Sequence, residues 1–186
     1  MIEETDELPR GRLLELGCGA GTNAIYFAAR GFAVTAVDGA PEAIDRARRQ
    51  AAESGSSAGT LAAEFHVADV LDLPAAIRGI GARRDAAFEP FDVLFDRGCY
   101  HCVRRTAADR FVAMLQRVTR PGTMFLLLAG NPNEPHGERG PPRVAEREMR
   151  EELGGLFEFL RITEFRFDDT GDGTRPLAWS VLLRRR

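Results

Sequence analysis

The sequence contains no lysine, and all 25 of its basic residues are arginine. Without lysine, the protein cannot form a Schiff base on its own side chains or use a lysine amine as a general base. The formal net charge is −3, so the chain has no excess of positive charge of the kind that nucleic-acid binding needs. We therefore expect no nucleic-acid partner.

Cysteine is also scarce. The three cysteines, Cys18, Cys99 and Cys102, are an odd number and make a poor disulfide framework, which favours a reducing cytoplasm. No apolar run approaches the roughly 18 residues that a membrane-spanning helix requires, and the start of the chain has no signal-peptide pattern. We expect a cytoplasmic protein that does not contact a membrane.

The order of hydrophobic segments predicts one α/β domain over residues 1–186, with residues 1–10 as a short polar leader. Strands are predicted at residues 12–16, 32–37, 61–67, 91–95, 124–129, 157–167 and 177–184, and helices at 22–30, 41–50, 106–118 and 144–153. Strand and helix alternate in the first part, which indicates a parallel sheet. The last two strands have no helix between them, which predicts a hairpin at an antiparallel edge.

Several segments between these elements are predicted as turns and loops. They are a loop at 54–59, an irregular stretch at 74–87, a turn at Pro121–Gly122 and a long loop at 131–142 that is dense in proline and glycine. A loop as long as 131–142 inside a compact domain is often functional.

A glycine-rich turn follows the first predicted strand in the sequence LLELGCGAGT. Gly17, Gly19 and Gly21 allow a tight turn and close approach of a ligand, and Asp38 ends the next strand as an acceptor for a ribose diol. A dinucleotide site has glycine at the sixth position of this motif, where this chain has Thr22. Glu15 would repel a pyrophosphate and attract a ligand ammonium group, which favours S-adenosyl-L-methionine over NAD.

The stretch ELGCGAG, the acid at Asp38 and the later acids resemble class I S-adenosylmethionine-dependent methyltransferases. The resemblance extends from Gly11 to the C-terminus and implies a doubly wound, Rossmann-like sheet of seven strands with helices on both faces. The last strand is then inserted antiparallel. The implied cofactor is S-adenosyl-L-methionine.

The resemblance also implies the positions of the cofactor-binding residues. Those at the methionine end are Glu15, Gly17 and Gly19, with Cys18, Gly21 and Asn23 in the same loop and helix start. Asp38, followed by Gly39, would hold the ribose hydroxyls, and Asp69 and Val70 would flank the adenine. Asp96 would meet the methionine amino group and the acceptor.

The segment FDVLFDRGCYHCV resembles more particularly the thiopurine, thiol and tellurite methyltransferases, as does GPPRV at 140–144. This resemblance implies a small, soft methyl acceptor: a thiol, a halide, tellurite or a selenium compound. A thiol that must lose its proton requires a base, for which His101 or Tyr100 is the candidate, whereas a thiolate or halide requires none. Arg97 would either attract an anionic acceptor or make a structural salt bridge.

Other interpretations of the sequence remain open. The acceptor could instead carry an oxygen or nitrogen nucleophile, or the chain could be a non-catalytic cofactor-binding subunit. Members of the resembled group usually carry several tens of residues before the first strand. The cover over the cofactor would then be absent here, come from the 131–142 loop or come from a partner chain. We expect a monomer or homodimer.

We predict no metal site. The pair Cys99 and Cys102 lacks the second pair that a zinc site needs. A thioredoxin-like redox pair would sit at a helix start after a different strand pattern, so we interpret the two cysteines as packing, with Cys99 lining the cofactor site.

Overall fold

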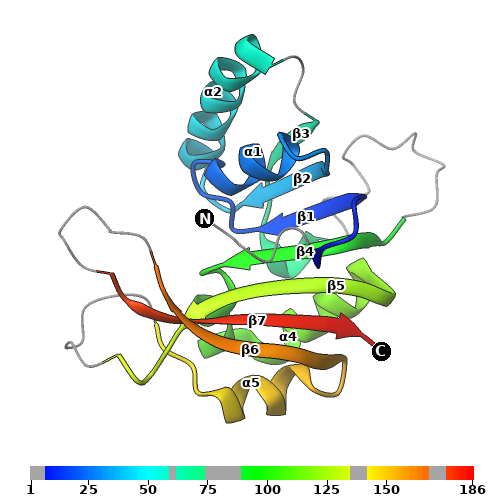
Figure 1. Ribbon diagram of the computed structural model, residues 1–186, viewed down its shortest axis with the longest axis vertical. Coiled ribbons are helices and arrows are strands. Elements are labelled where there is room, and N and C mark those ends of the chain that lie inside the picture. Colours follow the sequence, from blue (N-terminus) through cyan, green and yellow to red (C-terminus); the bar gives the residue numbers. More distant parts are fainter. Residues whose placement is uncertain (1–6, 59–61, 74–88, 135–141, 168–174) are drawn as a thin grey trace.

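A computed structural model describes residues 7–58, 62–73, 89–134, 142–167 and 175–186, with the side chains of 55–58 excepted (Figure 1). The stretch predicted to be irregular at 74–87 and most of the predicted loop at 131–142 lie outside the described residues. The remaining predictions can be compared with the structure directly.

The described chain contains one seven-stranded sheet in the order β3-β2-β1-β4-β5-β7-β6 (Figure 1). The strands are β1 (Arg12–Leu16), β2 (Ala33–Asp38), β3 (Ala63–Val67), β4 (Phe91–Arg97), β5 (Thr119–Gly130), β6 (Phe157–Arg166) and β7 (Leu177–Arg185). The pairs among β1 to β5 are parallel, and β7 pairs antiparallel with both β5 and β6. The expected doubly wound sheet with an inserted antiparallel last strand is confirmed.

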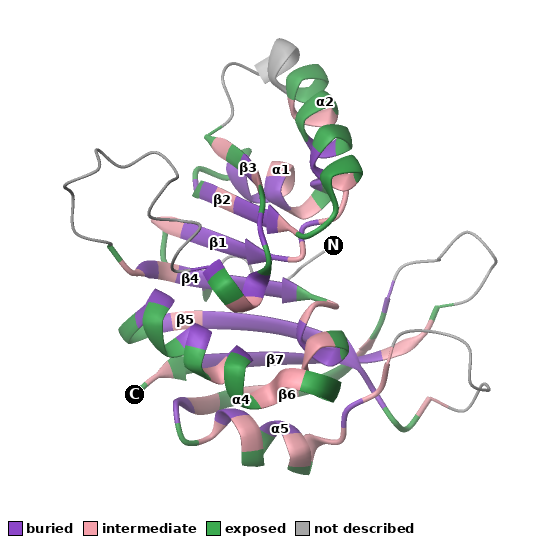
Figure 2. Ribbon diagram, turned by 180° about the vertical axis from the view of Figure 1, so that it is seen from behind, coloured by how far each residue is buried: buried purple, intermediate pink, exposed green. Residues whose placement is uncertain are grey.

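Helices cover both faces of this sheet because its strands carry apolar side chains on both sides. On one face, α1 (Thr22–Ala28) and α2 (Pro41–Ala58) pack on Leu13, Phe95 and Leu126. On the other, α4 (Tyr100–Val118) and α5 (Glu146–Leu153) pack on Leu14 and Leu127. Figure 2 shows these two helices in front of the sheet. The carboxyl ends of β1 to β5 meet at one edge, where ligands of open α/β sheets bind. A single turn of 3-10 helix, η2 (Val70–Asp72), follows β3 at this edge.

Two helices are longer than predicted. The predicted loop at 54–59 is wrong for 54–58, because α2 continues to Ala58. Helix α4 begins at Tyr100, not at Thr106, and its one residue with non-helical φ and ψ is Ala107, next to the predicted start. The earlier start has a physical cause that hydrophobic periodicity does not report: the Asp96 carboxylate accepts hydrogen bonds from the first backbone N–H groups of the helix.

Strand β5 is also longer than predicted, and it contains the predicted turn at Pro121–Gly122. Its pairing with β4 jumps from Phe91–Thr119 to Val93–Met124, and Gly122 has a φ of 91° inside this irregularity. The Thr123 hydroxyl accepts from the Arg120 N–H and donates to the Phe91 carbonyl, which satisfies the backbone groups there. The turn is therefore built into the strand and does not precede it.

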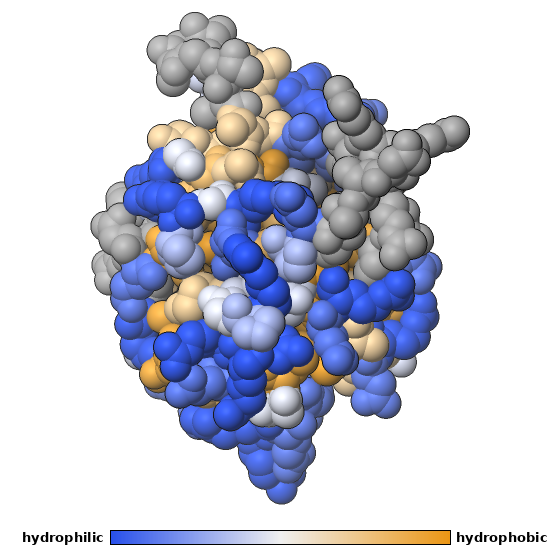
Figure 3. Space-filling model, turned by 90° about the vertical axis from the view of Figure 1, so that its right-hand side faces the viewer, coloured by the Kyte–Doolittle hydropathy of each residue, from blue (hydrophilic) through white to orange (hydrophobic). Residues whose placement is uncertain are grey.

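Figure 3 views the molecule from the right-hand side of Figure 1 and shows a mainly hydrophilic face with small, scattered hydrophobic areas. At the amino ends of the strands, ion pairs between Arg12 and Glu89 and between Arg120 and Asp92 link β1, β5 and the start of β4. No helix among the described residues is long and apolar enough to cross a membrane.

Candidate cofactor-binding site

The glycine loop between β1 and α1 bends in a way that only glycine adopts without strain. Gly17 has a φ of 67°, and a side-chain carbon added to it would lie 2.9 Å from Cβ of Cys99. Gly19 has a φ of 53°, and a carbon added there would meet no atom within 4 Å. The loop is thus closely packed against the start of α4 at Gly17 and opens onto free space at Gly19, as a ligand cradle requires.

Asp38, the last residue of β2, fixes this loop. Its Oδ2 accepts a hydrogen bond from the Gly19 N–H and its Oδ1 accepts one from the Ala40 N–H, both at 2.9 Å. Each carboxylate oxygen has a second lone pair for a ligand hydroxyl. The predicted ribose acceptor is therefore held rigidly, with Gly39 beside it in open space.

Glu15 is a buried acid with an unpaired oxygen. Its side chain is 1% exposed; Oε1 accepts from Asn23 Nδ2 at 3.1 Å, and Oε2 has no partner. Burial raises the pKa of Glu15 to about 8, with a smaller contribution from the charge of Asp96. A buried unpaired carboxylate oxygen is costly unless a ligand satisfies it, and an ammonium group would do so.

Asp96 ends β4 and begins α4. It is fully buried and accepts from the backbone N–H groups of Cys99 and Tyr100, each at 2.9 Å. Burial raises the pKa of Asp96 to about 7, against the opposing effect of these hydrogen bonds. Asp96 therefore orients the first turn of α4 at the carboxyl edge of the sheet.

The two residues predicted to flank adenine lie at the end of β3. The Asp69 carboxylate caps η2 by accepting from the Leu71 N–H at 2.9 Å, and Val70 is buried. Val67, which the sequence analysis did not single out, pairs in register with Asp38 and is 49% exposed. A large apolar side chain left exposed beside the predicted ribose acceptor offers a surface for a flat base. The position of Val67 at the end of a strand is the feature of the sequence that could have identified it.

His101 lies in the first turn of α4 and is 4% exposed. Its Nδ1 accepts a hydrogen bond from the Gly130 N–H at 3.0 Å, which links α4 to the end of β5. Burial lowers the pKa of His101 to about 4. A neutral imidazole whose Nδ1 accepts carries its proton on Nε2, so His101 presents a donor and not a basic nitrogen.

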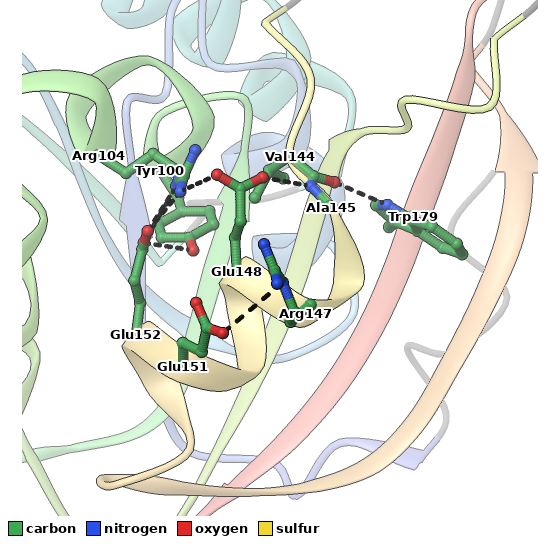
Figure 4. Close-up of polar contacts among 9 residues, drawn as sticks. All are labelled: Tyr100, Arg104, Val144, Ala145, Arg147, Glu148, Glu151, Glu152 and Trp179. Atoms are coloured by element: carbon green, nitrogen blue, oxygen red, sulfur yellow. Dashed lines mark hydrogen bonds and ion pairs between the residues drawn. The ribbon is translucent and has the colours of Figure 1, made fainter.

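Tyr100 points away from the glycine loop. Its side chain belongs to the core under α4, on the face of the sheet opposite to Leu13 and Glu15. Its hydroxyl donates to Glu152 Oε2 of α5 at 2.7 Å, and Arg104 pairs with the same carboxylate (Figure 4). Burial and this bond raise the pKa of Tyr100. The backbone N–H of Tyr100 therefore contacts Asp96, but its hydroxyl is bound to α5 and is not directed towards the glycine loop.

Arg97, the last residue of β4, is exposed, and its guanidinium lies 5.1 Å from the centre of the Phe167 ring. Among the described residues no salt bridge of Arg97 is found, and its charge favours the ionised form of Glu15. The structure therefore places a cation at the carboxyl edge of the sheet, held by an aromatic ring and close enough to the site to act on an anion.

Most of the predicted cofactor residues lie at the carboxyl edge of the sheet. They are the glycine loop with Cys18 buried in it, Glu15, Asn23, Asp38, Gly39, Asp69, Val70 and Asp96. The set offers an unpaired carboxylate oxygen for an ammonium group, a fixed carboxylate for a diol and an apolar surface for a base. These features fit S-adenosyl-L-methionine. In the described part of the chain, no group of three or more His, Cys, Asp or Glu residues could hold a metal ion.

Comparison with known proteins places the chain in a family. Residues 13–122 match the methyltransferase domain family. The 2-heptyl-1-hydroxyquinolin-4(1H)-one methyltransferase of Mycobacteroides abscessus is 29% identical over 164 residues, which are 88% of this chain and 66% of that protein. The chain thus spans about two thirds of the length of this relative.

Solved structures share the fold. A structure that concerns the conversion of a disulfide bond into a thioacetal group during echinomycin biosynthesis is 26% identical, with a TM-score of 0.76 over 98% of this chain and 78% of that one. TehB from Haemophilus influenzae is 19% identical, with a TM-score of 0.72 over 100% of this chain and 61% of that one. Because the family match covers more than half of the chain and includes the glycine loop, the chain belongs to the methyltransferase domain family, whose cofactor is S-adenosyl-L-methionine.

Proposed function

We propose that this chain transfers the methyl group of S-adenosyl-L-methionine to a small molecule with a soft nucleophile, such as a thiolate, as in the thiopurine, thiol and tellurite group. The observation that carries the acceptor class is the state of the two candidate bases. His101 Nδ1 is occupied by the Gly130 N–H, and the Tyr100 hydroxyl is bound to Glu152. An acceptor that is already an anion at neutral pH needs neither.

The cofactor supplies an electrophilic methyl group on a sulfonium, and the protein's own residues bind, orient and shield. Glu15 receives the ammonium end through its unpaired Oε2, and Asp38 holds the diol while it fixes the Gly19 amide. Arg97 attracts the anionic acceptor to the edge of the sheet, and the His101 Nε2–H orients it. Such positioning supplies much of the rate of a displacement whose leaving group is already good.

A sulfur acceptor is supported by the neighbour whose chemistry starts from a disulfide bond. The second candidate is an oxygen or nitrogen acceptor, and the hydroxyquinolone methyltransferase favours it. An acidic hydroxyl would also reach the site as an anion, so both candidates agree with the occupied state of His101 Nδ1 and the Tyr100 hydroxyl.

Calorimetric titration of the purified protein with S-adenosylhomocysteine and with NAD tests the cofactor. We expect micromolar binding of the first and none of the second. Formation of S-adenosylhomocysteine is then measured with small thiols, a halide, tellurite and a hydroxyquinolone. Turnover with a thiol that follows its thiolate fraction supports the proposal, whereas turnover confined to the hydroxyquinolone selects the second candidate.

The replacement His101→Asn tests whether this residue is a base. The Asn oxygen can accept from the Gly130 N–H as Nδ1 does, but the side chain cannot take a proton. We expect turnover of a thiolate acceptor to fall less than about tenfold, because general-base catalysis contributes roughly 10²- to 10⁴-fold where it operates. A loss of about 1000-fold with normal binding of S-adenosylhomocysteine would assign the base role to His101.

Cofactor binding should depend on pH through Glu15. In the free protein its raised pKa of about 8 keeps the carboxyl protonated at neutral pH, whereas a bound ammonium group favours the ionised form. Binding therefore releases a proton, and affinity rises as pH increases from 6 towards 8, by up to about tenfold per pH unit.

Calorimetry of S-adenosylhomocysteine in buffers of different ionisation enthalpy counts the released proton. Asp96 also titrates near neutrality, so Glu15→Gln identifies the source. We expect this variant to bind more weakly and to lose most of the proton release. An affinity that does not change between pH 6 and 8 in the unmodified protein would contradict the assignment of Glu15 to the ammonium group.

A further inference from the structure

The three cysteines of the chain are all free, and two of them, Cys99 and Cys102, lie three positions apart at the start of α4. Cys99 immediately precedes α4 and Cys102 lies in its first turn, and the Cys102 N–H donates to the Cys99 carbonyl at 3.1 Å. Residues three apart in a helical turn lie on the same face, with Cα atoms about 5 Å apart from helix geometry. A disulfide needs about 4.4–6.8 Å between these atoms.

The surroundings of the two thiols differ in a way that suits stepwise oxidation. Cys102 is exposed, whereas Cys99 is partly buried against the glycine loop, with its Sγ 3.4 Å from where a side-chain carbon on Gly17 would lie. An incoming reagent therefore meets Cys102 first, and the resulting mixed disulfide lies within one helical turn of the Cys99 thiol.

We propose that Cys99 and Cys102 form a redox-active dithiol at the rim of the cofactor site, which low-molecular-weight disulfides convert to an intramolecular disulfide that weakens cofactor binding. The Cys102 thiolate attacks the reagent disulfide and displaces one thiol. The Cys99 thiolate then attacks the Cys102 sulfur and displaces the second thiol. The two protein thiols are oxidised, the reagent disulfide is reduced to two thiols, and the two protein protons pass to the departing sulfurs.

The effect on the cofactor follows from the contact between Cys99 and Gly17. Cys99 packs so closely on the glycine loop that a side-chain carbon on Gly17 would lie 2.9 Å from Cys99 Cβ, and a disulfide would fix the side-chain torsions of Cys99 at this contact. Burial, and then the charges of Asp96, Cys102, Asp38 and Asp69, raise the pKa of the Cys99 thiol. Burial and the charge of Asp96 also raise the pKa of Cys102. Cys99 thus lies among the cofactor acids. Because neither thiolate is stabilised, both exchange steps are slow at neutral pH and faster at alkaline pH, and the disulfide once formed should not be strongly oxidising.

The experiment treats the full-length protein with oxidised glutathione and maps the products by mass spectrometry. Cleavage after Arg97 and Arg104 releases one peptide that contains both cysteines. We expect this peptide to lose two hydrogens, and the oxidised protein to bind S-adenosylhomocysteine about tenfold more weakly, within the usual range of coupling between two sites. Saturation with S-adenosylhomocysteine should slow the oxidation.

Two variants act as matched controls. Cys18→Ser should still form the disulfide, because Cys18 lies in the glycine loop with its Sγ directed to the Gly19 carbonyl. Cys102→Ser should bind S-adenosylhomocysteine as the reduced protein does, with or without oxidant.

Two outcomes would overturn the proposal: a peptide that carries glutathione on Cys102 beside a free Cys99, or a disulfide that leaves the affinity unchanged. The mapping is read without cofactor and without methyl transfer, so failure of the proposed acceptor chemistry would leave its result intact.

Discussion

Replacing Asp38 with alanine should weaken the binding of S-adenosylhomocysteine by about 100-fold or more. The carboxylate fixes the Gly19 and Ala40 amides, and it is the proposed acceptor for the ribose diol. Hydrogen bonds to a charged group contribute about 1.5–3 kcal/mol each, so loss of two of them corresponds to about 100-fold or more in affinity. Isothermal titration calorimetry of the variant gives the change directly.

Two controls separate binding from folding. Asp38→Asn keeps one oxygen and the shape of the side chain, so we expect a smaller loss. Asp45→Ala removes an exposed acid on α2 that pairs with the exposed Arg48, and the affinity of this variant should match that of the unmodified protein. If Asp38→Ala bound within about threefold of the unmodified protein while remaining folded, Asp38 would not be the ribose acceptor.

Replacing Phe27 with alanine should lower the free energy of unfolding by about 3–5 kcal/mol, the range for large aromatic residues in cores. Phe27 is fully buried where α1 meets the sheet. Its ring centre lies 5.4 Å from that of Phe32 and 4.9 Å from that of Phe95, both with edge-on geometry. The replacement removes these contacts and leaves a cavity under the helix that carries Asn23.

Urea unfolding followed by circular dichroism measures this change. Leu160→Ala is the matched control, since Leu160 on the edge strand β6 is 41% exposed, and its loss should change stability by less than about 1 kcal/mol. Similar losses in the two variants would mean that α1 does not depend on this aromatic cluster for its packing.

The family and the candidate cofactor residues follow from local sequence. An apolar strand, three glycines at spacing two and an acid at the end of the next strand occur within 26 residues, from Leu13 to Asp38. Glycine spacing and strand periodicity depend on neighbouring residues alone, so they can be recognised from the sequence without a structure. The final hairpin can be predicted for the same reason, because two apolar segments are separated by a turn-rich stretch.

The roles of the candidate bases depend on contacts far apart in the chain. The sequence analysis proposed Tyr100 and His101 because they follow Asp96 closely. The structure turns Tyr100 towards Glu152, 52 positions later, and binds His101 to the Gly130 amide, 29 positions later. Nothing in the local pattern specifies which partner a buried polar side chain finds. Burial and partner together set its pKa.

The sequence by itself determined the order of the strands along the chain, the glycine loop and the identity of the acids at the strand ends, because each rests on residues close together in the chain. Only the tertiary structure decided that Glu15 keeps an unpaired buried oxygen, that Asp96 starts α4 six residues before the predicted position, and that Cys99 packs on Gly17. These features arise where the ends of separate strands meet, and burial there is a property of the assembled sheet.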